Sequence, residues 1–262
     1  MLKKLYKHEF TSLYRILIPL YGLLIGLSAV DRILSMIDVK AGVLSLIEGL
    51  SAMVTGLLVI GLMFGGFILV IVNYYKSLLG KQGYLTLSLP VKVKDHIICK
   101  LVCGIVTFIT TIIAEFIAIC ILTSDIDAIV DLFKFLINAL ESLNMVYGTG
   151  KVAFVCFEVV ILAILVLAAN LLMYFAAMAI GQQFKRRILA SVGMFFGLYF
   201  MVEIILSLVM LSFDSWFDMS VLTSGFWTLQ ALFLFLFVCV AIEIVLFFAI
   251  TNHFLSKKLN LE

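Results

Sequence analysis

The stretch of sequence that decides the fold class is VAFVCFEVVILAILVLAANLLMYFAAMAI, residues 152–180. An α-helix rises about 1.5 Å per residue, so about twenty consecutive apolar residues are enough to cross the hydrocarbon layer of a bilayer. This run exceeds that length and contains one charged side chain, Glu158. We therefore predict that it forms a membrane-spanning helix.

The composition extends this prediction to the whole chain. Of its 262 residues, 65% are hydrophobic and 13% are charged, which leaves too little polar surface to cover a soluble globule. We predict an all-α integral membrane protein with six transmembrane helices. The predicted spans cover residues 13–30, 50–72, 97–122, 152–180, 188–211 and 226–250. The first run follows several lysines, as a signal peptide does, but we expect it to be retained as a first helix.

Lysine and arginine residues are distributed unequally between the two sides of the predicted membrane. The N-terminal segment, the second and fourth connections and the C-terminal tail hold most of the 18 basic residues. The basic residues on the opposite side are Arg32, Lys40, Lys134 and Lys151. By the positive-inside rule, both termini and the connection of residues 73–96 are predicted to be cytoplasmic.

Two segments outside the spans have apolar and polar faces at helical spacing. In residues 1–12, an apolar stripe lies opposite a basic one, which predicts an amphipathic interfacial helix on the inner leaflet. The alternative is a helical extension of the first span with a solvated face. Residues 124–150 repeat the pattern on the other side, so we expect an amphipathic helix on the outer surface.

Four acidic side chains lie inside the predicted spans, one in each of the third to sixth: Glu115, Glu158, Glu203 and Glu243. A charge at the bilayer centre costs about 2.5 to 3.5 kcal/mol on insertion scales, and such groups usually face the interior of the bundle. They predict a polar lining for a cationic or amphipathic substrate. The alternative is that they are protonated, or hydrogen-bonded to partners such as Asn170 and Ser207, and tie the helices together.

The cysteines all lie in or beside apolar segments, which favours packed, reduced thiols over a disulfide framework. They are Cys99, Cys103, Cys120, Cys156 and Cys239. His96 shares a helical face with Cys99 and Cys103, which makes a metal site conceivable. No acidic or second histidine neighbour completes a zinc pattern, so we predict packing and no metal.

Motifs of soluble enzymes are missing from the sequence. It contains no phosphate-binding loop of the Gly-x-x-x-x-Gly-Lys-Ser/Thr type, no His-Glu-x-x-His and no nucleophile elbow. Its longest polar connections, about thirty residues, are too short to bury a core of their own. We predict one transmembrane domain over residues 1–262, which is not an enzyme, holds no cofactor and has no nucleic-acid partner.

Pairs of glycines four residues apart recur in three of the spans: Gly22 and Gly26, Gly61 and Gly65, and Gly193 and Gly197. Such pairs let two helices approach closely. Packing within one chain explains any one of them equally well as packing between two chains.

The second connection has a pattern of its own. Between Gly83 and Lys92 it reads GYLTLSLPVK, a near-alternation of apolar and polar residues that Pro90 prevents from continuing as an ordinary helix. Residues 73–79 can prolong the second span, and Gly80 and Gly83 let that helix stop and turn. The leucines of the alternating stretch then offer an apolar face to the cytosol.

Together these features resemble the permease subunits of ABC-2 type transporters, especially small bacterial ones. The resemblance rests on the N-terminal helix, the six spans with both ends inside, and the connection NYYKSLLGKQGYLTLSLPVKVKDHIICK. Its most specific part is Tyr74 to Lys94, about a tenth of the chain, with its aromatic pair, LLGKQGYL and LSLPV. One departure is that no separate re-entrant hairpin can be located after the fifth span.

The resemblance implies a multi-pass protein of the bacterial cell membrane, in contact with membrane lipid, that works with a separate ATPase subunit. In that family the second connection holds a coupling helix that docks on the ATPase, which binds ATP and Mg. The matching residues here are Tyr74, Tyr75, Leu78, Leu79, Gly83, Tyr84, Leu85, Leu87, Leu89 and Pro90. The alternative is that this segment folds back onto the inner membrane surface.

The resemblance also implies pairing of two permeases through their first and fifth spans, which contain Gly22, Gly26, Gly193 and Gly197. The partner is a second copy, giving a homodimer, or a related permease. The expected function is ATP-driven export, with an amphipathic or antimicrobial peptide as a possible substrate. The alternatives are a proton-coupled secondary transporter that uses the intramembrane glutamates and, less favoured, a membrane-embedded enzyme.

Overall fold

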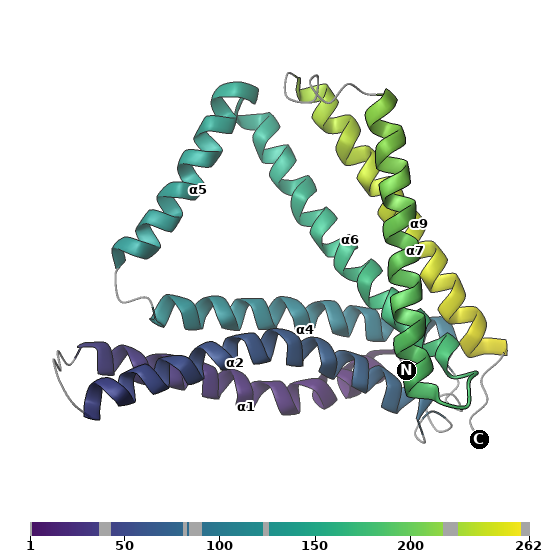
Figure 1. Cartoon of the computed structure of the whole chain (residues 1–262), viewed down its shortest axis with the longest axis horizontal. Helices are drawn as coiled ribbons and strands as arrows, with labels where there is room; N and C mark the ends of the chain where they lie inside the picture. Colours follow the sequence, from purple (N-terminus) through teal and green to yellow (C-terminus); the bar gives the residue numbers. More distant parts are fainter. Residues whose placement is uncertain are drawn as a thin grey trace. The chain divides into compact units, whose positions relative to one another are not determined.

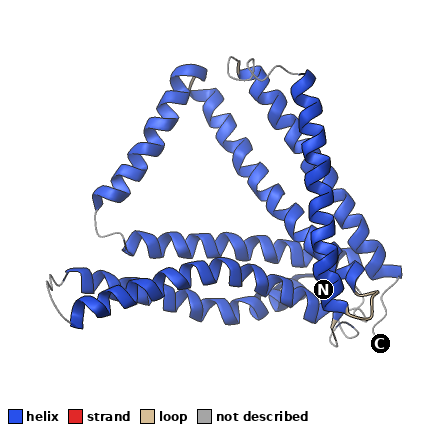
Figure 2. Ribbon diagram, viewed as in Figure 1, coloured by secondary structure: helices blue, strands red, loops and turns tan. Residues whose placement is uncertain are grey.

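A computed structural model of the chain describes residues 2–36, 43–80, 83, 91–122, 126–216 and 225–257. Throughout these residues the regular structure is helical, and no strand occurs among them (Figure 2). Figure 1 shows the elements in chain order, which are α1 (Leu2–Met36), α2 (Val43–Tyr74), η1 (Tyr75–Leu79), α4 (Val93–Leu122), α5 (Ile126–Tyr147), α6 (Thr149–Gly181), α7 (Arg187–Trp216) and α9 (Phe226–Lys257).

Six of the helical segments are long and apolar enough to cross a membrane: α1, α2 with η1, α4, α6, α7 and α9. For the described residues, the prediction of an all-helical fold with six helices long and apolar enough to span a membrane is therefore confirmed. Most of the helices extend beyond the predicted apolar runs. Residues 126–147 form the helix α5, as the pattern of residues 124–150 predicts.

Helix α1 runs without interruption from Leu2 to Met36, past Pro19. From Leu2 onward, the predicted interfacial segment of residues 1–12 therefore belongs to the same helix as the first span, and a bend between the two stays a prediction. No glycine or proline lies between Leu2 and Arg15 to break the helix. The position of its first turns on the inner leaflet stays a prediction.

The chain divides into two compact units. Unit 1 comprises Met1–Asn73 and Val102–Leu140, and unit 2 comprises Tyr74–Leu101 and Glu141–Glu262. Unit 1 therefore contains all of α1 and most of α2 and of α4, and unit 2 contains α6, α7 and α9.

In unit 1, α1 and α4 are joined by hydrogen bonds between polar side chains that lie near an apolar cluster. Leu24, Leu62 and Ala118 form a buried cluster contributed by α1, α2 and α4. Beside it, the hydroxyl of Tyr21 hydrogen bonds with that of Thr111 at 2.6 Å. A second pair, Tyr14 and Thr110, meets at 2.9 Å. Because lipid is as apolar as leucine, such bonds and close packing hold membrane helices together where the hydrophobic effect does not.

In unit 2, α6 packs against both α7 and α9. The end of α6 crosses the beginning of α7 so closely that a Cβ atom on Gly181 would lie 2.6 Å from the backbone N and Cα of Ser191. Only glycine fits there without a shift of the backbone. The crossing sets the angle at which α6 and α7 diverge, and with it the space between them.

The structure describes the beginning of the second connection, residues 73–80, which is helical through Leu79 as predicted. Residues 81–82 and 84–90 lie outside the described part of the chain. The helix continues after α2 through η1, a single π-helical turn, and ends at Gly80, whose N–H donates to the Tyr75 carbonyl at 2.8 Å. The Gly83 N–H in turn donates to the Gly80 carbonyl at 2.8 Å. The continuation and its stop are confirmed, although the turn is π-helical instead of α-helical. Tyr84, Leu85, Leu87, Leu89 and Pro90 lie outside the described residues.

Candidate functional site

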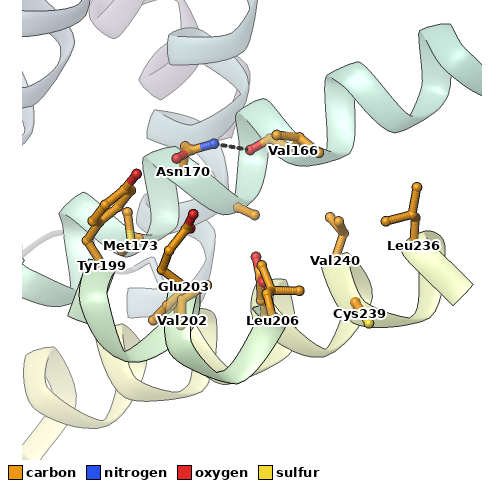
Figure 3. Close-up of a pocket in the computed structure, with 13 residues that line it drawn as sticks. Val166, Asn170, Met173, Tyr199, Val202, Glu203, Leu206, Leu236, Cys239 and Val240 are labelled. Atoms are coloured by element: carbon orange, nitrogen blue, oxygen red, sulfur yellow. Dashed lines mark hydrogen bonds between the residues drawn. The ribbon is translucent and has the colours of Figure 1, made fainter. Parts of the chain in front are cut away.

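A pocket lies among α6, α7 and α9, within unit 2, and has a volume of about 270 Å³ (Figure 3). Most of its wall is apolar, formed by side chains such as Val166, Leu206 and Val240. Pockets in proteins that bind small molecules typically have such apolar walls with a few polar groups set into them.

Two of the four predicted glutamates meet at this pocket. Glu203 reaches it from α7 and Glu243 from α9. Asn170 of α6 and Tyr199 of α7 also line it, and Figure 3 shows the side chains of Asn170, Tyr199 and Glu203 directed toward the same space. The sequence predicts inward-facing acids, and these two share one cavity.

The hydrogen bonds of the pocket leave both carboxylates available. Asn170 donates its amide to the Val166 carbonyl of its own helix at 2.9 Å. Ser207 donates to the backbone carbonyl of Glu203 at 2.6 Å, not to the carboxylate. The two partners suggested by the sequence therefore do not tie these glutamates to other helices.

The charge of the pocket is one-sided. Among the described residues that line it, Glu203 and Glu243 are acidic, and none is lysine, arginine or histidine. A carboxylate in apolar surroundings is stabilised by a nearby positive charge and destabilised by a like charge. The pocket therefore has the electrostatic character of a site for a cation.

Glu158 has a different role from the two pocket glutamates. Its carboxylate accepts a hydrogen bond of 2.9 Å from the side-chain amide of Gln230, which joins α6 to α9. For this residue, the structure agrees with the alternative interpretation of a tie between helices.

Glu115 lies on α4 in unit 1, so the residues of the pocket do not include it. Its Oε1 atom is buried and has no hydrogen-bond partner in the part of the chain that the structure describes. A buried carboxyl oxygen without a hydrogen-bond partner is energetically costly.

Asp31 is an acidic site that the span prediction missed, because the predicted first span ends at residue 30. It is 6% exposed, and its Oδ2 accepts a hydrogen bond of 2.6 Å from the Thr55 hydroxyl of α2. Its Oδ1 is buried without a partner among the described residues. The signal that finds it is the apolar run resuming at residues 33–34, which keeps position 31 on a packed helix.

Most of the described residues of the predicted coupling set are buried, whereas Tyr75 is half-buried. Tyr74 and Leu78 are fully buried and Leu79 nearly so. The ring of Tyr74 stacks on Phe175 of α6, and the Gln182 side-chain amide donates to the Leu79 carbonyl at 3.4 Å. These contacts anchor the beginning of the second connection in unit 2.

The glycine pairs of α1 and α7 face open space. A Cβ atom placed on any of Gly22, Gly26, Gly193 and Gly197 would meet no atom within 4 Å. The same holds for Gly61 and Gly65 of α2. Among the described residues, close packing within each unit therefore does not explain these glycines.

The histidine and cysteines of α4 are packed in the interior. His96, Cys99 and Cys103 are buried, and neither cysteine forms a disulfide with another described residue. Within the described ranges, no three side chains of the His, Cys, Asp and Glu types gather closely enough to hold a metal ion.

A comparison of the chain with protein-family models, curated proteins and solved structures finds no match.

Proposed function

We propose that the chain is the membrane-spanning permease subunit of an ATP-driven exporter of the ABC-2 type, in a bacterial cell membrane. The observation that carries the proposal is a pocket with two carboxylates among three of the six helices of spanning length. A chain without a nucleotide-binding motif needs a separate ATPase to supply energy, and that subunit would bind ATP and Mg.

In this proposal both termini and the second connection lie in the cytoplasm, because most lysines and arginines are on that side. The ATPase docks on the apolar face of Leu85, Leu87 and Leu89. The contact of Tyr74 with Phe175 supports a route by which movement of the docked segment reaches α6, one wall of the pocket.

The permease acts as a homodimer or with a related permease. The open space around the glycines of α1 and α7 supports helix contacts with a second chain, since small residues let two backbones approach closely. The substrate moves from the membrane or cytoplasm to the outside. An amphipathic or antimicrobial peptide whose cationic group reaches Glu203 and Glu243 fits the charge of the pocket.

The test is reconstitution. Purification of the chain in mild detergent from its native membrane, followed by mass spectrometry, identifies a bound ATPase. Liposomes that contain the chain with this ATPase are expected to show ATP-driven flux of a cationic peptide, and liposomes with either protein alone none. ATP hydrolysis or ATP-driven flux by the chain alone would contradict the proposal.

The alternative is a proton-coupled secondary transporter, which the carboxyl groups of unit 1 favour. Asp31 and Glu115 each have a buried oxygen without a partner among the described residues, and acids inside membrane helices are typical of proton pathways in transporters. In that case a pH gradient would drive flux without ATP, and Glu115→Gln would abolish the dependence on the gradient.

A further inference from the structure

We infer that the pocket among α6, α7 and α9 binds a small amphipathic cation, a quaternary or protonated amine attached to an apolar group. The inference rests on the proposed function, because it names the class of substrate that the exporter would accept at this site. Binding itself requires only this chain.

The first argument is charge. Glu203 and Glu243 line the pocket, and no basic side chain stands among the described residues around it. Glu243 is half-buried in this apolar cavity, and no basic group of the described wall offsets the hydration that its carboxylate loses there. A bound cation would offset that loss, whereas a neutral or anionic ligand would not.

The second argument is the chemistry of the remaining wall. Tyr199 and Phe247 add aromatic rings from α7 and α9. The Tyr199 ring lies 6.2 Å from that of Phe195 and 5.9 Å from that of Phe200, between centroids, so its neighbours limit its orientation. The face of an aromatic ring attracts quaternary and protonated amines. Aromatic and aliphatic walls around two carboxylates suit a ligand that is charged at one end and apolar at the other.

The third argument is size. The pocket has a volume of about 270 Å³. That is just below the range of about 300 to 1,000 Å³ that is usual for small-molecule pockets. One ring with one ammonium group fits, and a folded peptide does not. A peptide would be bound through a single cationic side chain.

The access to the site agrees with an amphipathic ligand. Glu203 is exposed and Glu243 is half-buried, so the carboxylate on α7 is the more accessible of the two. Both glutamates lie on helices of spanning length, where the surroundings are lipid. A ligand with an apolar part can concentrate in the membrane before it reaches the carboxylates.

Equilibrium binding of radiolabelled phenyltrimethylammonium to the full chain tests the inference. The chain is placed in nanodiscs of phosphatidylcholine without any ATPase, and the neutral isostere tert-butylbenzene serves as unlabelled competitor. We expect saturable binding at one site per chain. The neutral compound should compete at least about tenfold more weakly than unlabelled cation, because the two differ only in charge.

Variants then assign the binding to the pocket. The double variant Glu203→Gln and Glu243→Gln should raise the Kd at least about tenfold, because both charges are lost with little change of shape. Glu141→Gln, an exposed position of α5 outside the pocket, should leave the Kd unchanged. If the double variant does not elute as a folded species in size exclusion, the single variant Glu203→Gln, at an exposed side chain, should still weaken binding.

Unchanged binding in these variants, or equal competition by the neutral isostere, would overturn the inference. Because no ATPase is present, the result is independent of the exporter proposal. If the chain binds the cation but supports no ATP-driven flux, the binding site stands and the exporter proposal is wrong. If the chain supports ATP-driven flux but binds no cation, the exporter proposal stands and the binding site is wrong.

Discussion

The rings of Tyr74 and Phe175 stack face to face, with centroids 3.9 Å apart and planes inclined by 4°. Tyr74 is the last residue of α2 and Phe175 lies near the end of α6, and both are fully buried. The Tyr74 hydroxyl is buried without a hydrogen-bond partner among the described residues. The stacked rings therefore stabilise the fold by packing, whereas the buried hydroxyl without a partner destabilises it.

This arrangement predicts opposite effects of two substitutions at one position. Tyr74→Ala should destabilise the protein by about 3 to 5 kcal/mol, the usual cost of deleting a buried ring. Tyr74→Phe should be neutral or stabilising by about 1 kcal/mol, because it keeps the ring and removes the unpaired hydroxyl. Thermal unfolding in detergent measures both, and a strongly destabilised Tyr74→Phe protein would mean that the hydroxyl has a partner.

Gly181→Ala should be strongly destabilising. Its Cβ would lie 2.6 Å from the Ser191 backbone, which flexible side chains cannot relieve. We expect a loss of at least about 1 to 3 kcal/mol, as for overpacked sites. The matched control is Gly61→Ala, whose Cβ meets nothing within 4 Å and which should gain up to about 1 kcal/mol of helix stability. Equal melting temperatures for the two variants would contradict the close crossing of α6 and α7.

The hydrogen bond between Thr55 and Asp31 is suited to a double-mutant cycle. Thr55→Val should destabilise the chain by about 1 to 3 kcal/mol, because it leaves the buried Asp31 carboxyl without its donor. Once Asp31 is changed to Asn, the same Thr55→Val substitution should cost less, because no charge is left unpaired. Additive losses in unfolding free energy would show that the two side chains do not interact.

The glutamates should separate into two groups in transport. Glu203→Gln and Glu243→Gln should each lower flux of a cationic substrate about tenfold or more, because the pocket loses charge. Glu158→Gln should change flux less than about twofold, because glutamine still accepts the hydrogen bond of Gln230. Initial rates in proteoliposomes measure the difference, and a Glu158→Gln variant as impaired as Glu203→Gln would place Glu158 on the pathway.

Leu87→Asp should release the ATPase. If Leu87 presses into a groove of that subunit, the new carboxylate is buried without a partner, which costs several kcal/mol. We expect loss of ATPase co-purification and of transport, with normal insertion of the six spans. The control Lys92→Ala should be mild, since an exposed charge contributes about 1 kcal/mol or less. A bound ATPase and normal transport in Leu87→Asp would show that the segment is a surface loop.

The sequence predicts the elements better than it predicts their contacts. Apolar runs of spanning length identify the six helices, because the bilayer requires that length wherever a helix crosses it. The apolar runs do not predict where the helices begin and end, since α1 continues through polar residues such as Lys3 and Arg32 beyond its apolar run.

The candidate site could be predicted in part. A glutamate inside a span indicates an inward face, and Glu203 and Glu243 both line one pocket, although Glu203 remains exposed. That these two share a pocket while Glu158 bonds to Gln230 depends on how α6, α7 and α9 are rotated against one another. Near-uniform apolar helices carry little information on that rotation, because their faces differ little in hydrophobicity.

The turn η1 has a consequence for the chain that follows it. The bond from Gly80 to the Tyr75 carbonyl spans five residues, so this turn contains one residue more than an α-helical turn would. In α-helical geometry each residue advances the chain by about 1.5 Å and by about 100° around the axis. If η1 tightened into an α-helical turn, the residues after Gly80 would change register by one position, with a swing of about a quarter of a revolution around the axis of α2.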